Sequence, residues 1–133
     1  MKSFKGNVNK LTLENTYFRK VIHTGEHSQF VVMHINPGED IGEETHPHVE
    51  QTLFNISGVG KVVLDGVESD FNTGDVVVVT PGTKHNFINT GSEPLKIYTV
   101  YAPPNHLDGR IHKTKAEAIS DVKDEEFGEE VKE

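Results

Sequence analysis

Short runs rich in β-branched and aromatic residues alternate with glycine, proline and asparagine turns along most of the chain. Each run has the length of a strand. Asp65-Gly66 is the clearest turn, because this pair favours a two-residue hairpin. Leu11, Leu13 and Phe18 predict a further strand at the N-terminal edge. The remaining predicted strands cover residues 29–35, 51–57, 61–64, 67–71, 76–79, 85–89 and 95–101.

Regular spacing of about eight such strands predicts an all-β sandwich or barrel and not βαβ units. One helix is expected, because Thr114 and Glu117 form a capping box ahead of residues 116–119. We therefore predict a single domain over residues 1–120, with an N-terminal strand and a short C-terminal helix. Residues 121–133 are acidic and nearly free of large apolar side chains, so we expect a frayed or disordered tail.

Charge and composition narrow the choice of partners. The formal net charge of −8 argues against nucleic acid and against anionic membranes, which both bind basic patches. No apolar run approaches the roughly 18 residues that span a bilayer, and the first residues lack the pattern of a secretory signal. The chain has no cysteine, which excludes a thiolate metal site and a cysteine nucleophile. A cytoplasmic protein that binds a small molecule is the expectation.

The stretch EETHPHVEQ, residues 43–51, is the densest cluster of metal-capable side chains. Its spacing fits the first of two paired sequence motifs of the cupin superfamily. Gly38 is followed by five residues and then Glu44, and His46 comes after one more residue. Gln51 follows after four residues, and Gly58 after six. The resemblance departs from the family at two positions, because Glu44 replaces a histidine and Gln51 replaces a glutamate.

The second cupin motif is also present. Gly74, Thr80, Gly82, His85 and Asn89 fit it, with Thr80 in place of the usual proline. The resemblance covers about residues 30–101, and further stretches are similar to small single-domain cupins that are loosely described as mannose-6-phosphate isomerase-like. It implies a double-stranded β-helix, that is, a jelly-roll barrel. A description at that level carries little weight for function.

The resemblance implies that Glu44, His46, Gln51 and His85 are metal ligands. Strand alternation supports this, because residues 44 and 46 then share one face and His85 comes from a distant strand. Imidazole and oxygen donors without sulfur suit a divalent transition metal such as Zn, Mn, Fe, Ni or Co. A second register keeps the visible pair His46 and His48 with Gln51, but it breaks the spacing from Gly38.

In the favoured register His48 still faces the cavity or its rim, and either His48 or Glu50 is expected to act as general base. The predicted function is metal-assisted carbonyl or enediolate chemistry on a small polar or sugar-like molecule, or dioxygenation. Two alternatives stay open: a non-catalytic binding or sensor cupin, and a site that has lost its metal because Gln51 is a weak donor. Exposed strand edges favour a homodimer. The histidines expected on the surface are His23, His27, His106 and His112.

Overall fold

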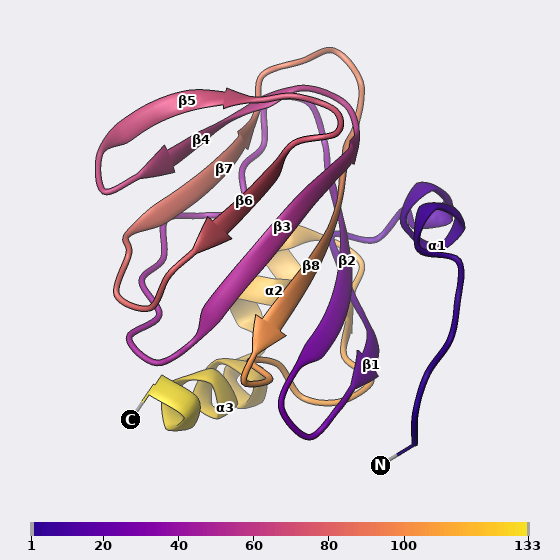
Figure 1. Cartoon of the computed structure of the whole chain (residues 1–133), viewed down its shortest axis with the longest axis vertical. Helices are drawn as coiled ribbons and strands as arrows, with labels where there is room; N and C mark the ends of the chain where they lie inside the picture. Colours follow the sequence, from indigo (N-terminus) through magenta and orange to yellow (C-terminus); the bar gives the residue numbers. More distant parts are fainter. Residues whose placement is uncertain (1, 133) are drawn as a thin grey trace.

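The structure is a computed structural model that describes residues 2–132. Nine strands and three helices lie within this part of the chain (Figure 1). The strands are β1 (Arg19–Thr24), β2 (Gln29–Ile35), β3 (Glu50–Ser57), β4 (Gly60–Leu64), β5 (Val67–Phe71), β6 (Val76–Val79), β7 (His85–Asn89), β8 (Leu95–Ala102) and β9 (Ile111–His112). They form a six-stranded sheet in the order β6-β3-β8-β2-β1-β9 and a three-stranded sheet in the order β5-β4-β7. The predicted all-β jelly-roll architecture is confirmed.

The two sheets share one hydrophobic core. Alternate residues of each strand point inward, so Leu53 and Ile97 from the larger sheet join Phe71 and Phe87 from the smaller one, all at 0% exposure. The rings of Phe71 and Phe87 meet edge to face, with centroids 5.2 Å apart. Each such side chain contributes roughly 1.5–3 kcal/mol by leaving water. This core is the rigid base on which the polar end of the barrel is built.

The segment before β3 runs along the free edge of β7. The N–H of Ile41 donates to the carbonyl oxygen of Phe87 at 2.9 Å, and Glu44 and His85 exchange two backbone hydrogen bonds of the same length. Asp40 and Glu44 thus form isolated antiparallel bridges with Ile88 and His85 of β7, and their segment lies along the edge of the smaller sheet. This pairing brings the first motif beside the second.

Gly58, at the end of the first motif, has a steric reason to be glycine. Its φ of +96° is one that residues with a Cβ rarely adopt. A Cβ there would also lie 2.6 Å from the carbonyl oxygen of Pro94. The hairpin at Asp65-Gly66 behaves as predicted, with φ of 47° and 82° at its two positions.

The predicted N-terminal strand is wrong, because residues 8–14 form a helix, α1 (Val8–Glu14). Asn7 caps it by accepting from the N–H of Lys10 at 2.9 Å. At the other end, the Lys96 ammonium donates to the carbonyl oxygens of Leu13 and Asn15. The apolar residues at positions 11 and 13 suggested a strand, but the hydrogen bonds at the two ends of this segment stabilise a helix instead.

The capping box at Thr114 and Glu117 is confirmed, and it starts α2 (Lys115–Ser120). The disordered tail is a wrong prediction: α3 (Val122–Lys132) follows α2, and Asp124 within it is 5% exposed. Asp121 accepts from the N–H of Asp124 at 3.2 Å, as an N-cap residue does. In Figure 1, α3, in yellow, lies at the bottom of the view, and α2 lies above it behind the strands; both are away from α1.

Strand β6 is less buried than its four valines suggest. It forms one edge of the larger sheet and pairs only with β3 in that sheet. Val76 and Val78 point outward and are 52% and 50% exposed, whereas Val79 is buried. Within the described residues no helix is long and apolar enough to cross a membrane.

Candidate metal centre and the adjoining cavity

His85 stands at the start of β7 and is 4% exposed. Its Nδ1 lies 2.9 Å from the carbonyl oxygen of Thr83, which only accepts, so Nδ1 carries the proton. Nε2 then presents a lone pair, the form in which imidazole binds a metal. Burial lowers the pKa of His85, which keeps the ring neutral at pH 7.

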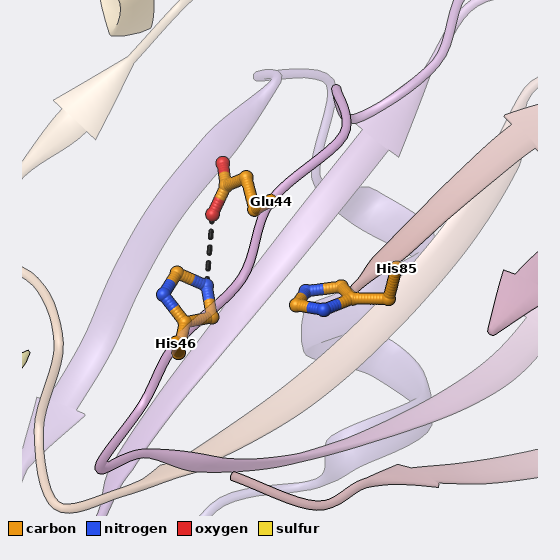
Figure 2. Close-up of side chains that lie close together, drawn as sticks. All are labelled: Glu44, His46 and His85. Atoms are coloured by element: carbon orange, nitrogen blue, oxygen red, sulfur yellow. Dashed lines mark ion pairs between the residues drawn. The ribbon is translucent and has the colours of Figure 1, made fainter. Parts of the chain in front are cut away.

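Glu44 and His46 lie on the segment before β3, and the His46 ring points toward the carboxylate (Figure 2). Glu44 Oε2 and His46 Nε2 are 2.8 Å apart. They do not meet with hydrogen-bond geometry, so both ring nitrogens of the buried His46 lack a hydrogen-bond partner. Loss of water by itself raises the pKa of Glu44, but the contact with His46 outweighs it and lowers that pKa to about 2. The carboxylate is therefore ionised at neutral pH.

Glu44, His46 and His85 each offer a ligand atom within 4.8 Å of the other two. Figure 2 shows the three side chains pointing toward a common space, and the two ring centroids are 5.3 Å apart. Two imidazoles and one carboxylate are a donor set of catalytic zinc and of non-haem iron. A divalent cation would also bind one of the two ring nitrogens of His46 that have no hydrogen-bond partner, and such nitrogens are costly to bury without one. The residues therefore fit a metal.

Gln51, the fourth ligand predicted from the sequence, is on β3 and is 3% exposed. Its Nε2 donates to Thr99 Oγ1 at 3.1 Å. This bond leaves Oε1 as the side-chain atom for a metal. A ligand role for Gln51 stays a prediction.

His48 and Glu50, the predicted general bases, are both exposed, and neither lines the cavity beside the metal candidates. Glu50 begins β3, and alternation turns it away from the inward side of Gln51. The group that the structure assembles is Glu44, His46 and His85, in the register counted from Gly38. The geometry does not support a catalytic role for His48 or Glu50.

A cavity of about 580 Å³ reaches Glu44 and His46. Its other walls come from the start of β1, the loop after β8, and both C-terminal helices, including Asp124 and Gly128 of α3. This volume lies within the range of small-molecule sites, roughly 300–1,000 Å³. The segment predicted to be a disordered tail thus forms part of the cavity wall.

His106 lines this cavity and is 8% exposed, so the prediction that it lies on the surface is wrong. Its Nδ1 lies 2.7 Å from Asp124 Oδ2, so Nδ1 carries the proton and Nε2 is an acceptor. Nε2 is buried and has no hydrogen-bond partner. Burial lowers the pKa of His106 to about 4, so the ring is neutral at pH 7. A neutral imidazole oriented by a carboxylate is the arrangement of a general base.

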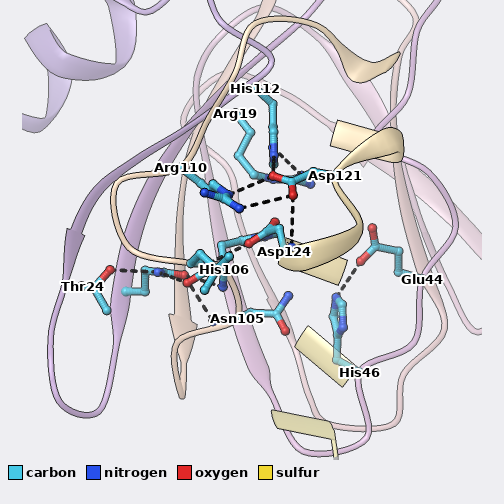
Figure 3. Close-up of polar contacts among 12 residues, drawn as sticks. Arg19, Thr24, Glu44, His46, Asn105, His106, Arg110, His112, Asp121 and Asp124 are labelled. Atoms are coloured by element: carbon cyan, nitrogen blue, oxygen red, sulfur yellow. Dashed lines mark hydrogen bonds and ion pairs between the residues drawn. The ribbon is translucent and has the colours of Figure 1, made fainter. Parts of the chain in front are cut away.

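A second group of metal-capable side chains consists of His112, Asp121 and Asp124, and it shares Asp124 with the dyad formed by His106 and Asp124. Its members already have partners, because Asp121 Oδ2 accepts from His112 Nε2 and from Arg110 Nε, both at 2.9 Å. Asp124 accepts from His106 and from the N–H of Leu107. Figure 3 shows this network. It corrects the expectation that His112 lies at the surface, and its role is to anchor α3.

Comparison with known proteins decides the family. A model of the cupin domain matches residues 31–101, which include Glu44, His46 and His85. The chain belongs to the cupin family. The uncharacterized protein YrkC of Bacillus subtilis (strain 168) is 43% identical to this cupin over 125 residues, covering 90% of this chain and 67% of that protein.

Two crystal structures resemble the whole barrel. BH2720 from Bacillus halodurans has a TM-score of 0.88 and 38% identity, and the match covers 90% of this chain and 95% of that one. A protein with a double-stranded β-helix domain from Klebsiella pneumoniae subsp. pneumoniae MGH 78578 has a TM-score of 0.67 and 28% identity, covering 84% and 98%. Both agree with the cupin assignment.

Sequence reasoning missed the dyad of His106 and Asp124. One signal was available, because Asp121 followed by Asp124 and Glu125 is typical of the first turn of a helix. That signal predicts α3, but no local pattern predicts that Asp124 meets a histidine on another loop.

Proposed function

We propose that this cupin is a metal-dependent enzyme that transfers protons on a small polar carbonyl compound, in the manner of an isomerase or epimerase. One observation carries the proposal: the dyad of His106 and Asp124 lies on the wall of the same cavity that reaches Glu44 and His46. Proton transfer between carbons depends on a positioned general base, so we take the dyad to favour this reaction over dioxygenation.

Glu44, His46 and His85, with Gln51 as a fourth donor, would hold a divalent transition metal, which supplies Lewis-acid stabilisation of a substrate oxygen when bound. His106 Nε2 accepts a proton from the carbon beside the carbonyl group. The electron pair of that C–H bond forms a carbon–carbon double bond, and the carbonyl oxygen takes the negative charge. Asp124 stabilises the imidazolium. In isomerisation the hydroxyl proton passes through water to the enediolate oxygen, and the imidazolium returns its proton to the former carbonyl carbon. In epimerisation the carbon takes a proton from water on its opposite face, and the imidazolium releases its proton to solvent.

Solvent-exchange measurements test this function directly. Metal-loaded protein is incubated in D₂O with glyceraldehyde and dihydroxyacetone, and ¹H NMR follows deuterium entering the carbon beside the carbonyl group. The wild-type protein should catalyse exchange or interconversion, and His106→Ala should not. Binding of several such compounds without any exchange would contradict the proposal.

One observation favours a second function, a non-catalytic binding or sensor cupin. Gln51 is neutral and its amide already donates to Thr99, so it is a weaker metal ligand than glutamate. A compound that raises the melting temperature and is recovered unchanged would support this function.

A homodimer is proposed as well. Strand β6 is an edge of the larger sheet, and the exposed Val76 and Val78 lie on it. Small-angle scattering should give the mass of two chains, and a monomer at all concentrations would contradict the proposal. A cytoplasmic location likewise stays a prediction.

A further inference from the structure

Arg19 is a buried cation that makes no direct ion pair among the described residues, although its charge reaches the carboxylates of Glu44 and Asp124 at longer range. It is on β1 and 6% exposed, and none of the ion pairs among the described residues involves it. Its Nη1 is 3.4 Å from His112 Nδ1, and its guanidinium carbon lies 5.2 Å from the centre of the Phe18 ring. A guanidinium stays charged, and an unpaired buried charge is costly. This cost suggests that Arg19 pairs with something from outside the chain.

Unsatisfied polar atoms gather on one cavity. The described part of the chain has six buried side-chain nitrogen and oxygen atoms without a hydrogen-bond partner, and five of them belong to Arg19, His46, Asn105 and His106. All four residues line the cavity described above. Buried polar atoms are nearly always satisfied, so these exceptions point to partners from outside the chain. His46 belongs to the candidate metal centre, and Arg19, Asn105 and His106 remain for a further ligand.

The side chain of Gln29 holds the loop that carries Asn105 and His106. Gln29 is 1% exposed, and its Oε1 accepts from the backbone N–H groups of Asn105 and His106 at 3.2 and 3.0 Å. Its Nε2 donates to the carbonyl oxygen of His106 at 2.7 Å. Figure 3 shows Asn105 between His106 and His46 in that view. The free atoms are therefore presented by a fixed backbone, as preorganised binding sites require.

The free atoms define the chemistry of the ligand. Arg19 Nε–H is a donor on a charged group, and an anionic acceptor is the partner that both satisfies the donor and offsets the charge. Asn105 Oδ1 and His106 Nε2 are acceptors, so they require donors such as hydroxyl groups. Lys115, the other cation on the wall, is already paired with Asp40. The wall also carries the carboxyl groups of Glu43, Glu44, Asp124 and Glu125. One cation on a wall with these acidic groups suits a singly charged carboxylate better than a doubly charged phosphate group.

We propose that the cavity binds a small hydroxycarboxylate whose carboxylate pairs with Arg19 and whose hydroxyl donates to Asn105 Oδ1 or His106 Nε2. This proposal rests on the proposed function, because it adds a carboxylate and a hydroxyl group to the carbonyl compound that the same cavity would take, and lactate reproduces that end of the compound. It concerns the end of the ligand that Arg19 holds, and it does not require the metal.

Three matched probes test it: lactate, lactamide without the negative charge, and propionate without the hydroxyl group. Titration calorimetry on metal-free and metal-loaded protein should show lactate binding about tenfold more tightly than either analogue. Arg19→Gln should abolish the preference for lactate over lactamide. Asn105→Ala should weaken the preference for lactate over propionate. Lys20→Gln, which removes the neighbouring positive charge on β1, should keep both preferences.

Equal affinity of the wild-type protein for the three probes would overturn the proposal, and so would a preference that survives in Arg19→Gln. Should Arg19→Gln fail to fold, the comparison of probes on wild-type and Asn105→Ala protein still decides. Metal content is measured on each sample. A carboxylate preference that depends on Arg19 in a protein without metal affinity would contradict the proposed function alone. Metal binding without the preference would contradict this inference alone.

Discussion

Glu44 and His85 face one another across an antiparallel bridge, in which each backbone N–H donates to the other's carbonyl oxygen at 2.9 Å. Directly opposed residues on paired strands project their side chains to the same face. The backbone thus sets two candidate ligands side by side, independently of their side chains. Replacing either side chain should remove a donor and leave the segment in place.

The double variant Glu44→Ala, His85→Ala should therefore lose metal binding while remaining folded. His48→Ala should keep it, because His48 is exposed and stands outside the group of ligands. Elemental analysis of protein purified without a histidine tag and loaded with divalent metal provides the measurement. A wild-type content below about a tenth of an equivalent would count against the site. Loss of metal only in His48→Ala would favour the register that joins His46 and His48.

Asp124→Asn should impair catalysis more than it impairs metal binding. The amide offers one oxygen where the carboxylate accepts both from His106 Nδ1 and from the N–H of Leu107, so the His106 ring loses its fixed tautomer. We expect kcat/KM for exchange to fall by roughly 100-fold or more, with unchanged metal content.

The pH profile separates a catalytic from a structural role of this dyad. The pKa of His106 is lowered to about 4, so its ring can accept a proton above that pH. The acid limb of kcat/KM in the wild-type protein should lie near this value and not near the usual value for histidine. An acid limb that is the same in wild-type and Asp124→Asn protein would show that Asp124 serves only the fold.

Acid should loosen the C-terminal helices. The hydrogen bond from His112, supported by Arg110, lowers the pKa of Asp121 to about 2, against an ordinary value of 3.8. A carboxyl group with a lowered pKa in the folded state stabilises that state above its unfolded pKa, and this contribution is lost as the pH falls from about 4 to about 2. Circular dichroism across this window should show that the Asp121→Asn protein, which lacks this contribution, unfolds at a higher pH than the wild-type protein. If the two proteins unfold at the same pH, the network does not stabilise α3.

Gly58→Ala should destabilise the barrel more than Gly74→Ala. Both glycines have positive φ, +96° and +92°, so the conformational cost is similar. Only at Gly58 does the added Cβ meet backbone, 2.6 Å from the Pro94 carbonyl oxygen, whereas nothing lies within 4 Å at Gly74. Urea unfolding should give a loss of about 1 kcal/mol for Gly74→Ala and several-fold more for Gly58→Ala. Equal losses would mean that the segment at Pro94 moves aside.

Local patterns predicted most of the barrel because they report on the backbone. Alternating apolar residues between tight turns gave the strands from 29 to 101, and Thr114 with Glu117 gave the start of α2. The same reasoning failed at residues 8–14, where the cap at Asn7 competes with a short apolar pattern. It also failed in the acidic tail, where polar contacts of Asp121 and Asp124 with distant residues hold the start of α3.

The sequence by itself determined the family and the positions of Glu44, His46 and His85, because motif spacing follows from strand alternation and turn geometry. Only the tertiary structure decided which histidine faces the cavity. His106 and Asp124 meet through the fold, and Arg19 becomes an unpaired buried cation only when β1 and the loop after β8 come together. Whether a charged group is buried and paired depends on residues that are far away in the sequence. The local order of residues along one strand therefore does not predict it.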